Sequence, residues 1–197
     1  TYDIPDSVNM TGDIAIDCEA MGLKQHRDRL CVVQISDGNG DAHLVQFHGQ
    51  YDAPNLKALL KDPSRTKILH FARFDVALVE HYLSVVMQPV YCTRTASRLA
   101  RTYTDKHGLK DICKELLSID LSKQQQSSDW GTKELSKEQI KYAASDVLHL
   151  HALRAKLDTM LERENRAQIA NACFSFIPTR AHMDLVGFEA GDIFAHS

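Results

Sequence analysis

The feature that most constrains the fold is the order of two hydrophobic patterns along the chain. Short β-type runs dominate the first half, at residues 13–19, 30–36, 42–47 and 67–71. The segment Asp37-Gly38-Asn39-Gly40, between the second and third runs, is typical of a hairpin turn. Helical spacing follows in Asp75–Leu83, where Val76, Val79 and Leu83 share one face. A hairpin of strands followed by alternating helices predicts an α/β fold with a mixed β-sheet flanked by helices.

The second half of the chain is predicted to be mainly helical. Helices are expected at residues 93–102, 109–117 and 136–161, in addition to an earlier short helix at residues 55–60. Ser136 and Gln139 form a capping box at the start of the longest helix. Beyond about Ala172 the helical spacing weakens, and Pro178 and Gly187 interrupt an apolar segment. We therefore expect one folded domain at residues 1–172 and an irregular tail at residues 173–197.

Residue spacing excludes several classes of protein. Five cysteines are scattered without a CxxC pair, so neither a zinc site nor a disulfide framework is expected. No stretch approaches the ~20 consecutive apolar residues that span a bilayer, so no membrane partner is expected. Residues 1–12 lack the basic and apolar segments of a secretory signal. These features together predict a cytoplasmic protein.

The charge balance limits how the chain can bind nucleic acid. Its formal net charge is −3, whereas proteins that hold nucleic acid by electrostatics alone are usually basic. A mildly acidic chain can still bind phosphate groups if divalent metal ions supply positive charge at the site.

Two acidic residues end the first predicted strand. Side chains alternate along a strand, so Asp17 and Glu19 point to one face while Ile16 and Cys18 point to the other. Neighbouring carboxylates repel each other, and a divalent cation with oxygen ligands removes that cost. The simpler alternative is a solvated strand end that carries two surface acids.

Two further acidic positions are weaker signals when each is taken alone. Tyr142 and Asp146 are spaced by four residues and share one helix face, as a simple surface hydrogen bond also requires. Asp75 opens a helix after an apolar strand, where a carboxylate often only complements the helix dipole.

The order of these residues carries more information than any one of them. A DxE pair on the first strand, an Asp that opens a mid-chain helix and a late YxxxD resemble the three exonuclease motifs of the DEDDy superfamily. The chain looks most like ribonuclease D from about Gly12 to Leu157. Supporting segments are Leu109-Lys110-Asp111, Leu121-Ser122-Lys123, Ser128-Asp129-Trp130 and Leu135 to Gln139.

This resemblance implies a ribonuclease H-like, DnaQ-like fold and a hydrolase that uses two divalent metal ions, Mg²⁺ or Mn²⁺. It implies that Asp17 bridges both ions and that Glu19 and Asp146 complete one ion site. Asp75 would hold the second ion, partly through water. Tyr142 would orient the attacking water.

The same resemblance suggests substrate contacts. The form DxExxGL places Met21, Gly22 and Leu23 after the acidic pair, and in oligoribonuclease-type relatives this Leu wedges between the two terminal bases. His70, near a strand end, is a further candidate, although it could equally be structural. Further candidate substrate contacts are Lys123, Gln124 and Trp130. Arg98 is another, because it belongs to a basic stripe along one predicted helix, with Arg94 and Arg101. The alternatives are an ordinary buried Leu at Leu23, a core Trp at Trp130 and a solvated basic face for the arginine stripe.

The number of residues after Leu157 indicates which ribonuclease D-like group the chain resembles most. About 40 residues follow, too few for the helical RNA-binding domains of ribonuclease D, and the chain is similar to the nanoRNase C group. Members of that group digest very short RNAs and assemble into rings. The tail contains much apolar surface, including Phe174, Phe176, Phe188 and Phe194, so we expect it to form contacts in a homo-oligomer.

The leading functional hypothesis is a 3′→5′ exoribonuclease that releases 5′-mononucleotides from short RNA. One alternative is an exonuclease that also, or mainly, degrades DNA, because no residue can be named that reads the 2′-hydroxyl. An alternative of another class is a nucleic-acid binding module without catalysis. That alternative requires one of the five motif residues to be missing, and all five are present.

Overall fold

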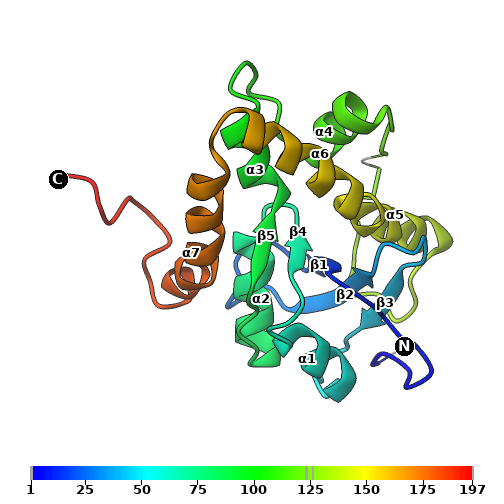
Figure 1. Cartoon of the computed structure of the whole chain (residues 1–197). Coiled ribbons are helices and arrows are strands. Elements are labelled where there is room, and N and C mark those ends of the chain that lie inside the picture. Colours follow the sequence, from blue (N-terminus) through cyan, green and yellow to red (C-terminus); the bar gives the residue numbers. More distant parts are fainter. Residues whose placement is uncertain (1, 123, 126, 197) are drawn as a thin grey trace.

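A mixed β-sheet forms the centre of the protein (Figure 1) in the computed structural model, which describes residues 2–122, 124–125 and 127–196. Its strands are β1 (Ile14–Ala20), β2 (Leu30–Ser36), β3 (His43–Gln46), β4 (Lys67–Leu69) and β5 (Val90–Cys92). They lie in the order β3-β2-β1-β4-β5. The first three pair antiparallel, whereas β4 is parallel to β1 and β5 is parallel to β4. The predicted hairpin and mixed sheet are confirmed.

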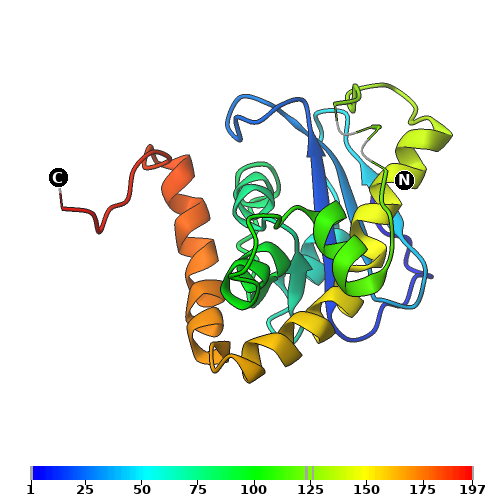
Figure 2. The ribbon, with the colours of Figure 1, turned by 90° about the horizontal axis from the view of Figure 1, so that it is seen from above.

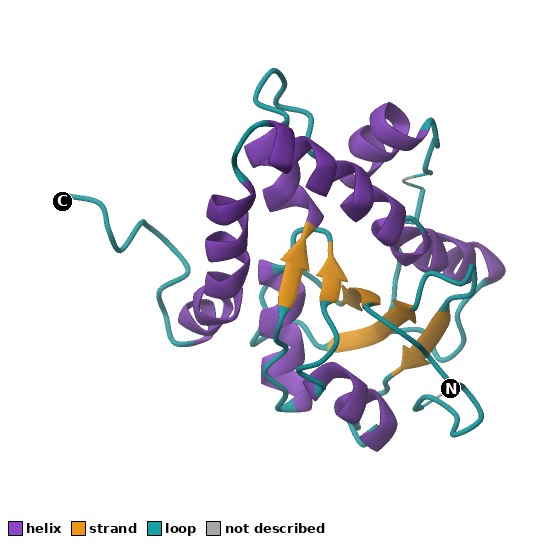
Figure 3. Ribbon diagram, in the orientation of Figure 1, coloured by secondary structure: helices purple, strands orange, loops and turns teal. Residues whose placement is uncertain are grey.

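Helices cover the sheet (Figures 2 and 3). They are α1 (Pro54–Lys61), α2 (Arg73–Leu83), α3 (Thr93–Ala100), α4 (Leu109–Leu117), α5 (Lys137–Leu148), α6 (Leu150–Arg163) and α7 (Ala167–Leu185). Helix α5 packs on β1, β2 and β3, α6 packs on β4, and α2 packs on β1 and β2. None of the described helices is both long and apolar enough to cross a membrane.

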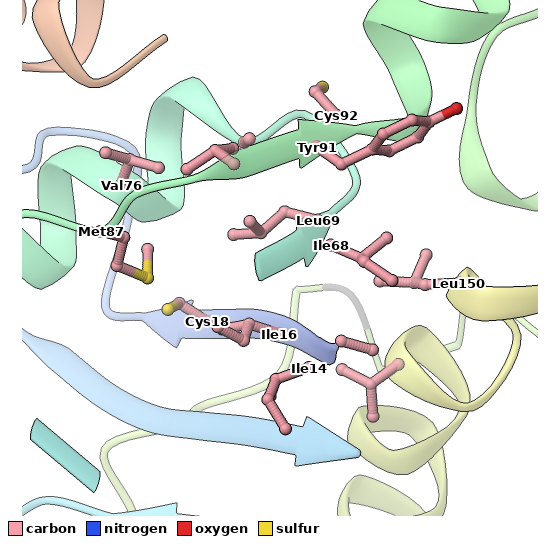
Figure 4. Close-up of a cluster of buried hydrophobic side chains, with 14 of the residues drawn as sticks. Ile14, Ile16, Cys18, Ile68, Leu69, Val76, Met87, Tyr91, Cys92 and Leu150 are labelled. Carbon is pink, nitrogen blue, oxygen red and sulfur yellow. The ribbon is translucent and has the colours of Figure 1, made fainter. Parts of the chain in front are cut away.

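A single large cluster of buried side chains joins the sheet to these helices. Figure 4 shows part of it, with Ile14 and Ile16 of β1, Ile68 and Leu69 of β4 and Leu150 of α6. All five side chains are buried, because β1 and β4 are inner strands of the sheet and helices cover them. This packing holds the carboxyl ends of β1 and β4 next to each other.

The helix predicted at residues 136–161 is in fact two helices. The capping box of Ser136 and Gln139 is present at the start of α5. The helix then breaks at His149, where φ is −105° and ψ is −4°, and α6 begins at Leu150. The break changes the direction of the chain, because α5 covers the antiparallel strands while α6 covers β4 and contacts α3.

The expectation of an irregular chain beyond Ala172 is wrong. Helix α7 runs from Ala167 to Leu185 and passes through Pro178, which cannot donate a backbone hydrogen bond. Tertiary packing outweighs that loss, because Phe174, Ile177 and Ala181 are buried and α7 packs against α2 and β5. The described residues after α7 extend away from the body (Figure 1).

Local differences occur where β4 passes into α2. The strand ends at Leu69 instead of Phe71, and Phe71 adopts a left-handed φ of 63°. Helix α2 begins at Arg73, so Asp75 lies in its first turn, as predicted. Strand β5 was not predicted, because its three residues are too short to show an alternating pattern.

Candidate active site

An open cleft of about 720 Å³ lies at the carboxyl ends of β1 and β4. The starts of α2 and α4, one face of α5 and residues 121–122, 127–128 and 130 form its walls. Its lining includes Asp17, Glu19, Asp75, Tyr142 and Asp146. The structure therefore brings together, in one cleft, the five residues that the three motifs singled out.

Strand β1 supplies the first two carboxylates by its alternation. Asp17 and Glu19 face the cleft, while Ile16 on the opposite side is buried in the core. Asp17 pairs in register with Gln34 of β2, and the Gln34 Nε2 donates a hydrogen bond of 2.9 Å to the Asp17 Oδ2. Gln34 is fully buried, so this carboxylate is held rigidly.

Helices α5 and α2 bring the other acids to the strand end. Carboxylate oxygens of Asp17, Glu19 and Asp146 all lie within 4.8 Å of one another and could hold a metal ion. Asp75 enters from the first turn of α2 and is buried. It is not part of that group of three, but its charge acts on Asp17 and Glu19.

Burial and mutual repulsion make these acids weak. Burial raises the pKa of Glu19 to about 9, and the charges of Asp146 and Asp75 add to the effect. Burial likewise raises the pKa of Asp75 to about 8 and that of Asp146 to about 7. The pKa of Asp17 is also raised, first by burial and then by the other three carboxylates.

The donor set suits a divalent cation. Among the described residues, no Lys, Arg or His forms an ion pair with any of these four acids. Clustered carboxylate oxygens without a cationic partner are the ligands that Mg²⁺ and Mn²⁺ prefer. The arrangement fits the metal ions that the resemblance implied.

Tyr142 lies one helical turn before Asp146 on the cleft face of α5. Burial raises the pKa of the phenol above its ordinary value, and the charges of Asp146, Glu19 and Asp17 raise it further. The hydroxyl therefore stays protonated and can donate a hydrogen bond. Trp130 packs beside this ring at a centroid distance of 6.1 Å.

Trp130 lines the cleft but is only 2% exposed. Its indole belongs to a small buried cluster with Cys31, Val32 and Ala143, next to Tyr142. In this conformation it offers no free face to a nucleobase, so the alternative of a core Trp describes its surroundings better than the stacking role does.

His70 lines the cleft just after β4. The Thr93 hydroxyl donates to the Leu69 carbonyl oxygen, so its oxygen accepts a hydrogen bond of 2.9 Å from the His70 Nδ1. Burial, helped by the charge of Arg94, lowers the pKa of His70 to about 3. The ring is neutral, and its buried Nε2 is an acceptor without a partner among the described residues.

The loop after β1 forms one rim of the cleft. Met21, Gly22 and Leu23 all line it, and the Met21 and Leu23 side chains are 48% and 82% exposed. The alternative of a buried Leu23 is therefore excluded. Substrate contacts by these three residues stay predictions.

The three arginines of the predicted stripe lie in different environments. Arg101 is fully buried and pairs with Glu115, so a continuous basic face is wrong. Arg98 is exposed and does not line the cleft. Arg94 does line it, with its guanidinium 5.2 Å from the ring centroid of Phe71.

The segment before α5 contributes less of the cleft than expected. Gln124 is exposed and lies outside the lining, whereas Ser127 and Ser128 belong to it. Lys123 lies outside the described residues. The α4 start, with Leu109 and Lys110, forms the wall on this side.

Gln34 and Phe71 are residues of the site that the sequence analysis did not single out. Gln34 was hidden in a strand, although an uncharged polar residue in the run LCVVQIS is a usable signal. Phe71 has no such signal, because its exposure in the cleft depends on a left-handed φ that the sequence does not show.

Comparison with known families decides the class of protein. Residues 3–162 match the model of a family described as 3′–5′ exonuclease. The chain belongs to the 3′–5′ exonuclease family. This exonuclease therefore belongs to a class of enzymes that hydrolyse phosphodiester bonds, as the motif order predicted.

Solved structures of NrnC from Brucella melitensis are similar to this exonuclease over its whole length. NrnC bound to pGG has 56% sequence identity and a TM-score of 0.96, and the alignment covers 100% of this chain and 96% of that chain. NrnC with bound Mg²⁺ has 55% identity and a TM-score of 0.95, with the same coverage.

Ribonuclease D is a more distant relative. The enzyme of Granulibacter bethesdensis is 31% identical over 153 residues, which are 78% of this chain and 38% of that protein. The Escherichia coli structure has 26% identity and a TM-score of 0.76, covering 86% of this chain and 44% of that one. This chain thus spans about two fifths of the length of the curated ribonucleases D that it matches.

These comparisons confirm three predictions. The resemblance to ribonuclease D and to nanoRNase C is confirmed, and so is the DnaQ-like fold. A divalent metal is the cofactor of this family, in agreement with the Mg²⁺-bound NrnC structure and the carboxylate group described above.

Proposed function

We propose that this exonuclease is a 3′→5′ exoribonuclease that hydrolyses short RNA oligonucleotides to 5′-mononucleotides with two divalent metal ions. The observation that carries the proposal is the group of Asp17, Glu19 and Asp146, whose carboxylate oxygens lie within 4.8 Å of one another beside Tyr142. The similarity to NrnC supports a short substrate, because that protein has been solved with pGG.

Each acid has a proposed role at the metal site. Asp17 would be the shared ligand, Glu19 and Asp146 would complete one ion site, and Asp75 would hold the other. Bound ions would neutralise the four carboxylates, lower the pKa of a water molecule and stabilise charge on the scissile phosphate. Gln34 supports this set by holding Asp17 through a hydrogen bond of 2.9 Å.

Tyr142 is proposed to hold the attacking water. Its raised pKa leaves the hydroxyl as a donor, so the phenol positions the water and does not remove its proton. The water oxygen gives up a proton to solvent as it bonds to the phosphorus of the last phosphodiester, and the bond to the 3′-oxygen of the preceding nucleotide breaks. That oxygen leaves with a proton from solvent, and a 5′-mononucleotide is released.

The cleft also offers groups for the rest of the substrate. The neutral His70 has an acceptor nitrogen at Nε2, which suits a ribose hydroxyl. The exposed Leu23 suits the face of a base, and Arg94 suits a phosphate group. Degradation of DNA remains the competing proposal, because a 3′-hydroxyl satisfies the same acceptor.

The decisive experiment compares substrates directly. End-labelled RNAs and DNAs of two to about 20 nucleotides are incubated with Mg²⁺ or Mn²⁺, and the product ladder is followed. The proposal expects 5′-mononucleotides from the 3′ end and the highest kcat/KM for RNAs of a few nucleotides. Preference for DNA of the same length would overturn the RNA assignment, and absence of hydrolysis with both metals would overturn the enzyme assignment.

We also propose that the active form is a homo-oligomer, such as a ring, built partly by the C-terminal segment. Phe176 on α7 and Val186, Phe188, Ile193 and Phe194 after it are exposed large apolar residues. A surface of this kind is typical of an interface between chains. The location in the cytoplasm and the division of the chain at residue 172 stay predictions.

The oligomer is tested by light scattering of the whole chain and of a variant that ends at Leu185. This end point keeps all of α7, whereas removal of Phe174 and Ile177 would open the core. A truncated protein that is folded but monomeric supports the proposal. A whole chain that is monomeric at micromolar concentration and fully active refutes it.

A further inference from the structure

The loop that follows β1 carries Leu23 to the mouth of the cleft. Its two ends are joined by a backbone hydrogen bond of 3.1 Å, in which the Met21 N–H donates to the Arg29 carbonyl. Leu23 is 82% exposed, so no apolar packing inside the protein holds its side chain. The position of this side chain therefore depends on whatever holds its backbone.

Asp28 closes the loop from within. Its Oδ2 accepts a hydrogen bond of 2.9 Å from the Lys24 N–H, which belongs to the peptide group that joins Leu23 to Lys24. The side chain of Arg27 donates to both carboxylate oxygens at 2.6 and 2.9 Å. The residue is only 9% exposed. The hydrogen bonds from Arg27 and from the Lys24 backbone lower the pKa of Asp28 to about 2, so the carboxylate is charged at every working pH.

Gly22 makes this closure possible. A Cβ atom at position 22 would lie 2.3 Å from the Asp28 Oδ2, which is far inside contact distance. The absence of a side chain therefore lets the carboxylate approach the backbone directly before Leu23. Gly22 and Asp28 are therefore a matched pair: the missing side chain of Gly22 leaves the space that the Asp28 carboxylate fills.

The loop is also fastened at its base. The Arg29 Nη2 donates to the Gly131 carbonyl at 3.1 Å, and a Cβ at Gly131 would lie 2.6 Å from the Met21 Sδ. The base of the loop thus rests on the segment before α5, which carries Tyr142 and Asp146. Asp28 holds the rest of the loop, between Met21 and Arg29, through its hydrogen bond from the Lys24 N–H.

We propose that Asp28 is a positioning residue for substrate binding, which holds the backbone of Leu23 so that this side chain stands at the cleft mouth. The inference rests on the proposed function, because it requires Leu23 to contact the terminal bases. It assigns Asp28 a role through Leu23 and none at the metal site. Loss of the carboxylate frees the loop, so binding weakens while the chemical step is retained.

A double-mutant cycle tests this role. KM and kcat are measured for a two-nucleotide RNA with a 5′-phosphate, in Mg²⁺, for the wild type, Leu23→Ala, Asp28→Ala and the double variant. We expect each single variant to raise KM roughly 10-fold with kcat within about threefold, a modest loss for a misplaced binding group. The double variant should be no worse than Leu23→Ala alone, because coupled residues are not additive.

Two further variants keep the test sharp. Asp28→Asn retains an oxygen for the Lys24 N–H and should recover most of the KM, whereas a purely electrostatic role predicts a defect as large as that of Asp28→Ala. Gly22→Ala should reproduce the KM defect from the opposite side. Asp62→Ala is the matched control, because Asp62 also accepts a main-chain hydrogen bond, from Ser64, but lies outside the cleft lining.

The possible outcomes separate the two claims. Absence of hydrolysis by the wild type contradicts the proposed function itself. If Leu23→Ala raises KM but Asp28→Ala does not, or if the two effects add in full, the function stands and the role of Asp28 is overturned. A silent Leu23→Ala also overturns it. If Asp28→Ala does not fold, Asp28→Asn and Gly22→Ala decide, and normal KM values for Gly22→Ala refute the inference.

Discussion

Helix α2 begins between two buried acidic sites that differ in their partners: the single carboxylate of Asp184 and the group of acids in the cleft. Asp184 of α7 is buried, and its carboxylate accepts two hydrogen bonds of 2.6 Å from the Arg73 guanidinium. Arg180 forms an ion pair with the same carboxylate at 2.9 Å. Two residues after Arg73, Asp75 joins the acids of the cleft, where no described cationic side chain pairs with them. One group is neutralised by the chain itself, and the other is left for a cation from outside.

This difference separates a structural carboxylate from a functional one. Burying an isolated charge is costly, so a chain under selection for stability alone supplies a partner, as it does for Asp184. The cleft acids instead keep raised pKa values and have no cationic partner among the described side chains. Perturbed titrations of this kind gather at functional sites. The two groups should respond in opposite ways to the same substitution.

The largest expected effect is on catalysis. Asp146→Asn keeps the shape of the side chain but removes a proposed metal ligand, so kcat/KM should fall by at least about 10³-fold. The metal-free variant should be no less stable than the wild type, because one member of a repelling group has lost its charge. Activity assays in Mg²⁺ and thermal melts in EDTA check both parts. Substantial hydrolysis by this variant would contradict the metal assignment.

The next effect concerns Tyr142 in the same group. Tyr142→Phe removes the hydroxyl that is proposed to hold the water, so kcat should fall by roughly 10²–10⁴-fold. The carboxylates remain, so Mg²⁺ should still raise the melting temperature as it does for the wild type. Single-turnover rates and Mg²⁺ titrations separate the two readouts. A variant with near-normal kcat would place this hydroxyl outside the chemistry.

The sequence predicted the acidic group well for a physical reason. Alternation on a strand and the four-residue spacing on a helix determine which side chains share a face, so Asp17 with Glu19, and Tyr142 with Asp146, follow from local geometry. That these two pairs share one site with Asp75 was predicted only from the order of the three motifs. The structure adds the distances and the unpaired charge.

The Asp184 group could not be predicted in the same way. Its partners Arg73 and Asp184 are 111 residues apart, and the pattern around Pro178 indicated an irregular tail instead of a helix. Packing of Phe174 and Ile177 stabilises α7, and local propensity does not report such tertiary contacts. The exposed Phe71 and the closure of the Leu23 loop by Asp28 were missed because they depend on backbone conformation and close approach.

A smaller effect is expected at the paired group. Asp184→Asn leaves the guanidinium groups of Arg73 and Arg180 without their carboxylate, and Arg73 is partly exposed, so the loss should be about 1–3 kcal/mol of unfolding free energy. That corresponds to a fall in Tm of roughly 3–10 °C for a chain of this size. kcat per folded molecule should stay within about threefold. A loss of activity without a loss of stability would mean that the two groups are coupled through α2.

The smallest expected effect is the pH dependence of the metal-free protein. The pKa values of Asp146, Asp75 and Glu19 are raised to about 7, 8 and 9 in the folded state, whereas carboxyl groups of an unfolded chain titrate near 4. Between these limits the folded state binds more protons than the unfolded state, so stability falls as pH rises. The lowered pKa of His70, about 3, acts in the opposite direction only below about pH 6.5.

The useful window is therefore pH 6.5 to 8.5, measured in EDTA. Tm should fall by roughly 2–5 °C across it, because the acids interact and lose their protons only in part. Saturating Mg²⁺ should reduce the slope by replacing the missing protons as the neutralising charge. Glu19→Gln should reduce it without metal, whereas Asp184→Asn should leave it unchanged, since Asp184 lies outside the cleft and is paired with Arg73 and Arg180. A wild-type protein whose metal-free Tm is flat or rises with pH would show that the cleft acids are not held in the unpaired state that distinguishes them from Asp184.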